Sequence, residues 1–163
     1  MKLSLTVIAM LYVLYPQAQA VELRAGSALP SLYCSAGYER YTNSFLDLSV
    51  RGFFESSKKR NLDYHAFGLD VMMQTRLNRE QKFSGRATFG GTIQKESEPW
   101  VYKEWPFKRK LNYGLVGEFS ANWMMSSYFD LNLFAQQKLL FNRALGLTQF
   151  VCGLGLRYEF PHY

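Results

Sequence analysis

Histidine and cysteine are the residues of this chain best suited to acid–base, nucleophilic or metal chemistry, and each occurs twice. His65 lies at the edge of an apolar alternation and His162 lies in the C-terminal tail, so neither is placed as a general base over a hydroxyl nucleophile. Two histidines and two cysteines without close spacing do not form a zinc-binding pattern. We therefore expect no catalytic residue, no metal and no cofactor, and we predict that the chain is not an enzyme.

Two basic clusters and one aromatic cluster are the candidate surface-binding features. They contain Lys58, Lys59, Arg60, Lys108, Arg109 and Lys110, with Trp100, Tyr102 and Trp105 as the aromatic residues. Basic clusters of this size are usually solvated loops, and the functional alternative is contact with an anionic surface such as lipopolysaccharide phosphates. The aromatic cluster fits either a girdle at the membrane interface or a loop that binds a sugar, a lipid headgroup or a protein partner.

The N-terminus has the three parts of a secretory signal peptide. Lys2 precedes an apolar run over residues 3–15, and the small-residue cleavage site Ala18–Ala20 follows. The run is shorter than the roughly 20 residues of a membrane-spanning helix. We expect residues 1–20 to be removed and residues 21–163 to form a single domain. An exported chain of this kind is a poor fit to nucleic acid, despite its formal net charge of +6.

Period-two alternation of apolar and polar residues continues through the rest of the chain. From Leu111 to Trp123, one parity is apolar or glycine and the other is mostly polar. These segments match the roughly nine to eleven residues of a tilted strand that crosses a bilayer, whereas strands of soluble domains have about five or six. Seven strands are predicted, near residues 31–40, 44–54, 62–75, 82–94, 110–123, 127–138 and 148–160.

An eighth strand is needed, because bacterial single-chain membrane barrels have even strand numbers from eight upward. Residues 100–107 and residues 22–29 are the two candidates. Prolines at 99 and 106 weaken the first, and the alternation of short and long links favours the second. The short links would then be periplasmic, and the longer ones, with the basic clusters, would face outside. We predict an all-β, antiparallel, eight-stranded transmembrane barrel.

The polar parity of the strands carries charges of both signs. The predicted interior charge network consists of Asp47, Arg51, Asp70, Arg86, Glu118, Asp130 and Arg157. In a small membrane barrel this parity faces inward, where charges are tolerated when opposite signs pair and plug the interior. A soluble barrel could place the same face in water. The alternative interpretation is therefore a soluble periplasmic barrel that binds a small apolar ligand.

Cys34 and Cys152 both lie on apolar parities, in the first and the last of the seven clearly predicted strands. An exported chain is found where disulfides form, so a bond across the closure of the barrel is one interpretation. That bond requires the strand of Cys34 to pair with the last strand and a Cα separation below about 7 Å. Otherwise, the two cysteines are free and face lipid.

The last strand has an unbroken apolar parity that includes Phe150, Tyr158 and Phe160. Here the chain resembles bacterial outer-membrane β-barrel proteins, whose final strand ends in an aromatic residue that is read by the barrel assembly machinery. The tail of residues 161–163 departs from that pattern, because the aromatic is normally the last residue. The pattern over residues 30–160 resembles the small OmpA-like and OmpX-like barrels.

This resemblance implies a structural or surface-interaction role in the bacterial outer membrane, with membrane lipid and the assembly machinery as partners. Some small barrels of this class act on lipids through a His beside a Ser and an acid. The late strands lack a His beside a Ser. A membrane-embedded lipid hydrolase is therefore the third alternative.

Overall fold

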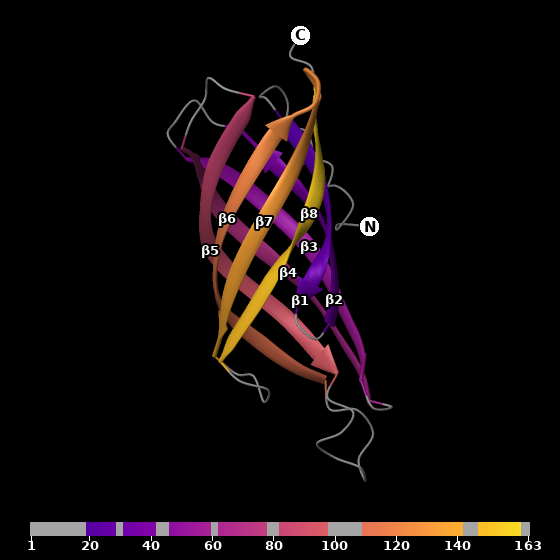
Figure 1. Ribbon diagram of the computed structural model, residues 1–163. Coiled ribbons are helices and arrows are strands. Elements are labelled where there is room, and N and C mark those ends of the chain that lie inside the picture. The colour runs from indigo at the N-terminus through magenta and orange to yellow at the C-terminus, as the bar shows by residue number, and fades with distance from the viewer. Residues whose placement is uncertain are drawn as a thin grey trace, which may run out of the picture.

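Eight strands form the part of the chain that the computed structural model describes, which comprises residues 19–28, 31–41, 46–59, 62–77, 82–97, 109–141 and 147–160. The strands are β1 (Gln19–Ala28), β2 (Ser31–Arg40), β3 (Asp47–Lys59), β4 (Leu62–Arg76), β5 (Phe83–Ser97), β6 (Arg109–Met124), β7 (Phe129–Leu140) and β8 (Thr148–Glu159). Each pairs antiparallel with the next, and β8 pairs with β1, which closes the barrel (Figure 1). Within the described ranges, no helix is long and apolar enough to cross a membrane.

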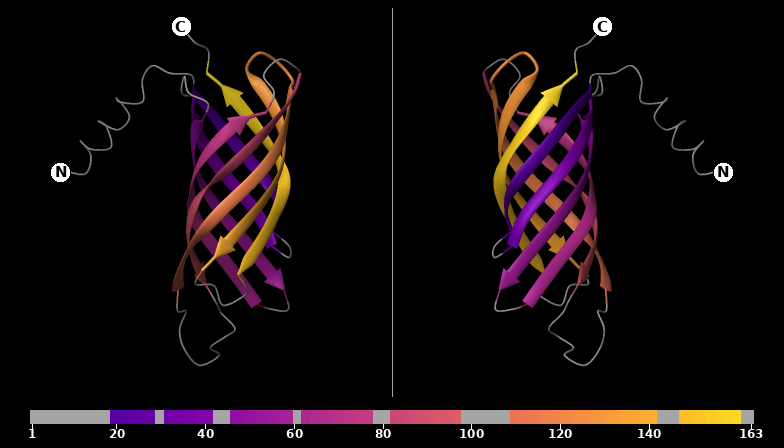
Figure 2. Two further views of the ribbon diagram at one scale, coloured as in Figure 1. Left: turned by 90° about the vertical axis from the view of Figure 1, so that its left-hand side faces the viewer. Right: turned by 90° about the vertical axis from the view of Figure 1, so that its right-hand side faces the viewer.

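The start of β1 and the end of β8 lie at the same end of the barrel, because the strand number is even (Figure 2). We call this the terminal end, and we call the opposite end, where β1 connects to β2, the loop end. The predicted eight-stranded antiparallel barrel is confirmed. The strand that was missing from the seven clear predictions is β1, the first in the chain. The other candidate, residues 100–107, lies outside the described residues.

The first strand begins before the predicted cleavage site. The backbone N–H of Phe160 donates to the carbonyl oxygen of Gln19 at 2.9 Å, and Ala20 pairs with both Glu39 and Glu159. Removal of residues 1–20 would therefore shorten β1 by two residues at its terminal end. Residues 1–18 lie outside the described part of the chain.

The strands are staggered, and the stagger fixes their tilt. Following Cα partners from Phe83 around the barrel returns to β5 at Ile93, a shift of ten residues. The path passes through Trp123, Leu131, Leu156, Leu23, Ala36, Gly52 and Leu69. Closed barrels with such a stagger tilt their strands by roughly 35–45°. At that tilt, strands of 10 to 16 residues are long enough to cross a bilayer.

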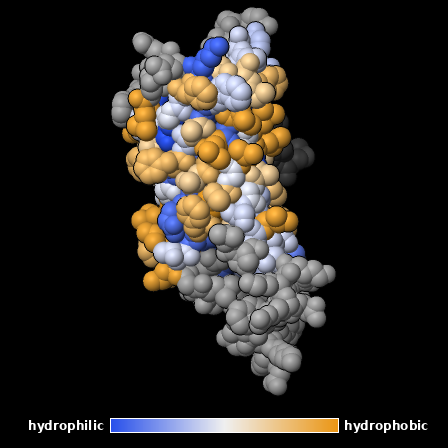
Figure 3. All heavy atoms as spheres, in the orientation of Figure 1, coloured by the Kyte–Doolittle hydropathy of each residue, from blue (hydrophilic) through white to orange (hydrophobic). Residues whose placement is uncertain are grey.

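Side chains alternate between a polar interior and an apolar exterior. In β7, Asn132, Gln136 and Lys138 are buried, whereas Leu133 and Leu139 between them are exposed. Figure 3 shows apolar residues, in orange, spread over the outer face of the strands. This polarity is the reverse of that in a soluble barrel, where the apolar face is buried.

Aromatic side chains gather on the outer face at the terminal end. The rings of Phe83 and Trp123 stack with centroids 5.9 Å apart. The ring of Tyr158 lies 5.0 Å from that of Phe129 and 5.2 Å from that of Phe160. The two predicted assembly residues are thus part of an outward aromatic cluster beside the last strand.

Glycines allow the backbones to approach closely where β1 meets β8. Gly26 and Gly153 are direct partners in this seam. A Cβ built on Gly153 would lie 2.2 Å from the carbonyl oxygen of Ala25, and one on Gly26 would lie 2.3 Å from that of Cys152. The obstacle in each case is backbone, which cannot move without separating the strands. The closure of the barrel therefore depends on glycine at both positions.

We expect Gly153→Ala to destabilise the folded barrel by about 1–3 kcal/mol, the usual cost of overpacking. Gly117→Ala is the matched control, because a Cβ there would meet no atom within 4 Å. The control should be neutral or slightly stabilising, since alanine restricts the unfolded chain. Urea unfolding midpoints of both variants in lipid vesicles measure the difference, and equal midpoints would contradict the role of the seam glycines.

Candidate functional site

Two arginines and two glutamates form a central cluster that crosses the barrel interior. Arg24 of β1 and Arg51 of β3 each donate to Glu118 Oε2 of β6 at 2.7 Å. Glu22 Oε2 lies 2.7 Å from Arg24 Nη2 and 3.7 Å from Arg51 Nη2. All four residues are at most 5% exposed. Because β6 is three strands from β1 around the ring, these ion pairs connect separate walls of the barrel.

A second cluster, nearer the terminal end, is centred on Arg157 of β8. Its Nε lies 2.7 Å from Glu39 Oε2, its Nη1 lies 2.5 Å from Asp130 Oδ2, and its Nη2 lies 2.5 Å from Glu159 Oε1. Arg86 Nη1 of β5 lies 3.0 Å from the same Glu39 oxygen. Each guanidinium thus has a carboxylate partner, which offsets part of the cost of burying its charge.

Tyr41 follows β2 and lies against this second cluster. Its hydroxyl donates to Glu159 Oε1 at 2.8 Å. The guanidinium carbons of Arg76 and Arg157 lie 4.1 Å and 5.2 Å from the centroid of its ring. Arg76 Nε also lies 3.6 Å from Asp47 Oδ2. Cation–π and ionic contacts therefore continue the charge network to the terminal end of the barrel.

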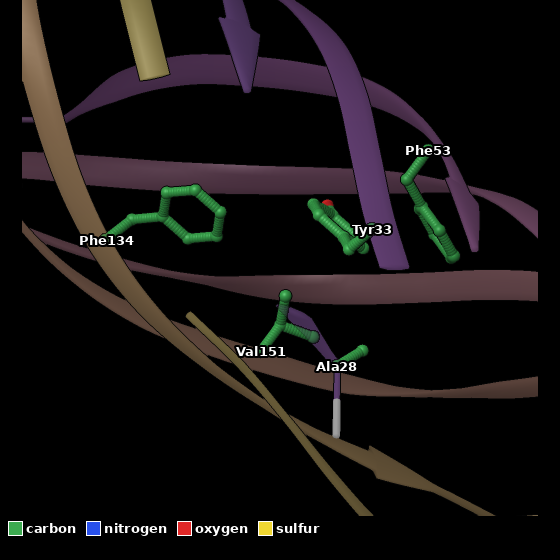
Figure 4. Close-up of a cluster of buried hydrophobic side chains, with 5 residues drawn as sticks. All are labelled: Ala28, Tyr33, Phe53, Phe134 and Val151. Carbon is green, nitrogen blue, oxygen red and sulfur yellow. The ribbon is translucent and has the colours of Figure 1, made fainter. Parts of the chain in front are cut away.

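Five apolar side chains form a layer inside the barrel (Figure 4). The ring centroid of Tyr33 is 5.9 Å from that of Phe53 and 6.1 Å from that of Phe134. Arg24 Cζ of the central cluster lies 4.7 Å from the centroid of the Phe134 ring. The complete layer consists of Ala28, Tyr33, Phe53, Phe134 and Val151.

Lys138 of β7 is fully buried beside this apolar layer. Its Nζ lies 2.9 Å from Asp70 Oδ1 and 3.2 Å from the centroid of the Phe53 ring. Gln136 Nε2 donates to the other oxygen of Asp70 at 3.2 Å. The lysine charge is thus held by an ion pair and by an aromatic face.

Buried acids nearer the loop end accept hydrogen bonds from neutral side chains. Glu96 Oε1 accepts from the Tyr64 hydroxyl at 3.0 Å and from Gln94 Nε2 at 2.5 Å. Glu55 accepts from Gln149 Nε2. Polar contacts therefore extend along the interior from one end of the described barrel to the other.

The structure places the seven residues of the predicted interior network on the inward parity, and six of them are at most 5% exposed. Asp130 is half-buried. They do not form one contiguous set, because Arg51 and Glu118 belong to the central cluster whereas Arg86, Asp130 and Arg157 belong to the second.

Sequence reasoning missed the main ionic partners Glu22, Arg24, Glu39 and Lys138. The alternation of Glu22 and Arg24 with apolar residues in β1 was the signal that could have revealed the first two. Lys138 continues the inward parity of Asp130 and could have been found in the same way.

The basic clusters begin and end strands. A loop location is wrong for Lys58, Lys59 and Arg109, whereas Lys110 lies in the strand predicted over residues 110–123. Lys58 and Lys59 are the last residues of β3, because the ladder continues to the pairs with Asp63 and Leu62. Arg109 and Lys110 are the first residues of β6. Both sets lie at the loop end. The remaining predicted surface residues, Arg60, Trp100, Tyr102, Trp105 and Lys108, lie outside the described residues.

The predicted disulfide between Cys34 and Cys152 is not formed, and both thiols are free, as the alternative prediction had it. β1 lies between their strands, because Cys34 pairs with Ala25 and Cys152 pairs with Ser27. Neighbouring strands are about 4.8 Å apart, so two strand spacings exceed the Cα separation that a disulfide spans. The prediction required the strand of Cys34 to close the barrel, and β1 does so instead.

His65 faces outward at the loop end, beside two serines that sequence reasoning did not connect with it. Ser56 and Ser97 are its partners on β3 and β5. The Ser97 hydroxyl accepts from the His65 backbone N–H at 3.0 Å and donates to its carbonyl oxygen at 3.1 Å. The His65 ring stacks on Phe54 with centroids 6.0 Å apart. The Ser97 proton is therefore engaged by backbone and not by the imidazole.

The residues that the structure describes contain no group of three or more His, Cys, Asp or Glu side chains able to hold a metal ion.

Comparisons with known proteins identify the fold through solved structures alone, since no family model and no curated protein matches the sequence. The Neisserial surface protein A barrel superposes with a TM-score of 0.69 at 11% identity, over 88% of this chain and 96% of that one. The outer membrane protein OprG from Pseudomonas aeruginosa gives 0.66 at 11% identity, over 90% and 97%. The outer membrane enzyme PagL gives 0.51 at 8% identity, over 85% and 97%. The expected resemblance to small outer-membrane barrels is confirmed for the fold.

We expect Glu118→Ala to destabilise the barrel by about 3–5 kcal/mol, because Arg24 and Arg51 would lose their shared partner inside the barrel. Ser120→Ala, at the next inward position of β6, is the control and should have little effect. The temperature at which the folded band disappears on an unboiled gel gives the comparison. Equal transition temperatures for the two variants would count against a stabilising role of the central cluster.

Proposed function

We propose that this chain is an integral barrel of the bacterial outer membrane, with a plugged polar interior and a structural or surface-interaction role. The observation that carries this proposal is the inverted polarity of the strands. The large apolar side chains of Leu32, Phe83 and Phe119 are 76%, 65% and 70% exposed on the outer face. Arg51 and Glu118, in contrast, are buried in the interior. An apolar exterior on this scale is stable in lipid and would aggregate in water.

The orientation that fits this proposal has the terminal end in the periplasm and the loop end outside. The longest gap between strands, from Ser97 of β5 to Arg109 of β6, lies at the loop end, and outer-membrane barrels have their longer loops on the outer side. The basic residues that end β3 and begin β6 then lie at the outer end of the barrel, where lipopolysaccharide phosphates are candidate partners. This orientation puts Tyr158 and Phe160 at the periplasmic end, which supports the proposal that they act as an assembly signal.

The plug consists of the central cluster and the apolar layer together. Arg24, Arg51 and Glu118 connect β1, β3 and β6 across the interior, and Tyr33 and Phe134 pack beside them. Side chains that fill an eight-stranded barrel leave little room for an aqueous channel.

Specific observations disfavour the two alternatives, a soluble ligand-binding barrel and a lipid hydrolase. A soluble barrel for an apolar ligand needs apolar parities that line its interior, whereas the interior here holds Arg51, Glu118 and Arg157. A lipid hydrolase needs an activated hydroxyl, whereas the Ser97 hydroxyl is bonded to the backbone of His65. We therefore propose no enzymatic activity, although an enzyme is known with this fold.

Cell fractionation tests the membrane assignment. We expect the full-length chain expressed in a Gram-negative host to be recovered in the outer membrane and to migrate differently on a gel before and after boiling, because closed barrels resist detergent until heated. A soluble periplasmic domain of the same host, followed in parallel, is the control. Recovery of the chain in the soluble periplasmic fraction would overturn the proposal.

Planar bilayer recordings test the plug. We expect the purified, folded chain to give no sustained open-channel current, because the central cluster and the apolar layer obstruct the interior. A large, water-filled porin inserted under the same conditions is the control. A sustained current of porin size from this chain would contradict the plugged interior.

A further inference from the structure

Lys95 of β5 is a charged residue on the apolar outer face. It follows the outward parity of β5, between buried Gln94 and buried Glu96. Its cross-strand partners are Phe67 and Leu111, which are 50% and 60% exposed. Lysine is costly on the lipid face of a barrel except near the membrane interface, where its long side chain can reach the headgroups. The position of Lys95 therefore marks the boundary of the apolar band at the loop end of the barrel.

On β3, β4 and β5 the next outward positions toward the loop end are polar, and exposed Leu32 on β2 continues the same row. Ser56, His65 and Ser97 are consecutive partners across β3, β4 and β5. The ladder between β5 and β6 pairs Ser97 with Arg109 of β6. The row below, which contains Lys95, begins with Phe54 and Phe67. We call Ser56, His65, Lys95 and Ser97 the rim patch.

Lys95 is the cation of the rim patch, and the described outward residues around it include no acid. No described side chain forms an ion pair with Lys95 within the parts of the barrel that the structure covers. The outward positions around it carry no carboxylate; they are His65, Phe67, Leu69, Ile93, Ser97, Arg109, Leu111 and Tyr113. The first acid in the outward parity of β4 is Asp63, whose partner in the ladder is Lys58. Among the described outward residues around Lys95, none supplies an anion for its charge.

We propose that the rim patch binds the phosphate of a lipid headgroup in the leaflet at the loop end. Lys95 supplies the charge, and the exposed His65 ring and the Ser56 hydroxyl supply donors in the adjacent row toward the loop end. Phe67 and Leu111 flank Lys95 in its own row and provide an apolar contact for the acyl chains of the same lipid. That apolar contact favours a lipid over free phosphate. The inference rests on the proposed membrane function and names a ligand class for it.

Lipid retention by the folded full-length chain tests the proposal. The protein is inserted into vesicles of equal phosphatidylglycerol and phosphatidylcholine with identical acyl chains, extracted in mild detergent, and weighed with its bound lipids by native mass spectrometry. We expect phosphatidylglycerol to be retained about fivefold more than phosphatidylcholine, which corresponds to the roughly 1 kcal/mol that one lysine contributes near an anionic surface. Lys95→Gln should lower the preference toward equality, and Lys95→Arg should keep it.

Lys82→Gln is the matched control, because Lys82 is exposed beside Phe83 at the opposite end of the barrel. It should retain the preference. An unchanged preference in Lys95→Gln, or the same loss in Lys82→Gln, would overturn the rim patch as a specific site. Complete displacement of phosphatidylglycerol by inorganic phosphate would overturn the lipid assignment. These outcomes differ from failure of the membrane proposal, in which the chain would not enter either lipid as a heat-modifiable barrel.

Discussion

Charge pairing across a narrow interior is the constraint on which the rest of this structure depends. Glu118 of β6 accepts from both Arg24 of β1 and Arg51 of β3, so one carboxylate fixes three strands relative to each other. A slip of any of these strands by one residue would turn its charges outward and its apolar side chains inward. The stagger of the barrel and the polarity of its two faces are therefore specified by the same set of contacts.

Aromatic rings give interior cations a second favourable contact in addition to their carboxylate partners. Lys138 is bound to Asp70 on one side and lies over the Phe53 ring on the other. Arg24 is shared between Glu118 and the face of Phe134. Because a ring face attracts a cation without needing its own counterion, the apolar layer and the charged clusters pack together as one continuous core.

The sequence predicted faces better than partners. Alternation in β6 and β7 located both strands to within about two residues and identified Glu118 as inward. Alternation cannot give the height of a residue in the barrel, which depends on the stagger, so the contact between Glu118 and Arg24 was out of reach. β1 remained one of two candidates because it is short and rich in small residues, and the supposed disulfide failed for the same reason, since the identity of the closing strand was open.

The order of the strands along the chain also determines when the buried charges of the interior can meet their distant partners. Arg24 meets Glu118, 94 residues later in the chain, and Glu39 meets Arg86 and Arg157, 47 and 118 residues later. Such distant contacts are slow to form. Until β8 joins β1, the nascent sheet holds arginines and glutamates whose partners are still absent, along an edge that exposes unpaired backbone groups. Barrel closure is thus the step at which the chain first becomes compatible with a hydrocarbon environment.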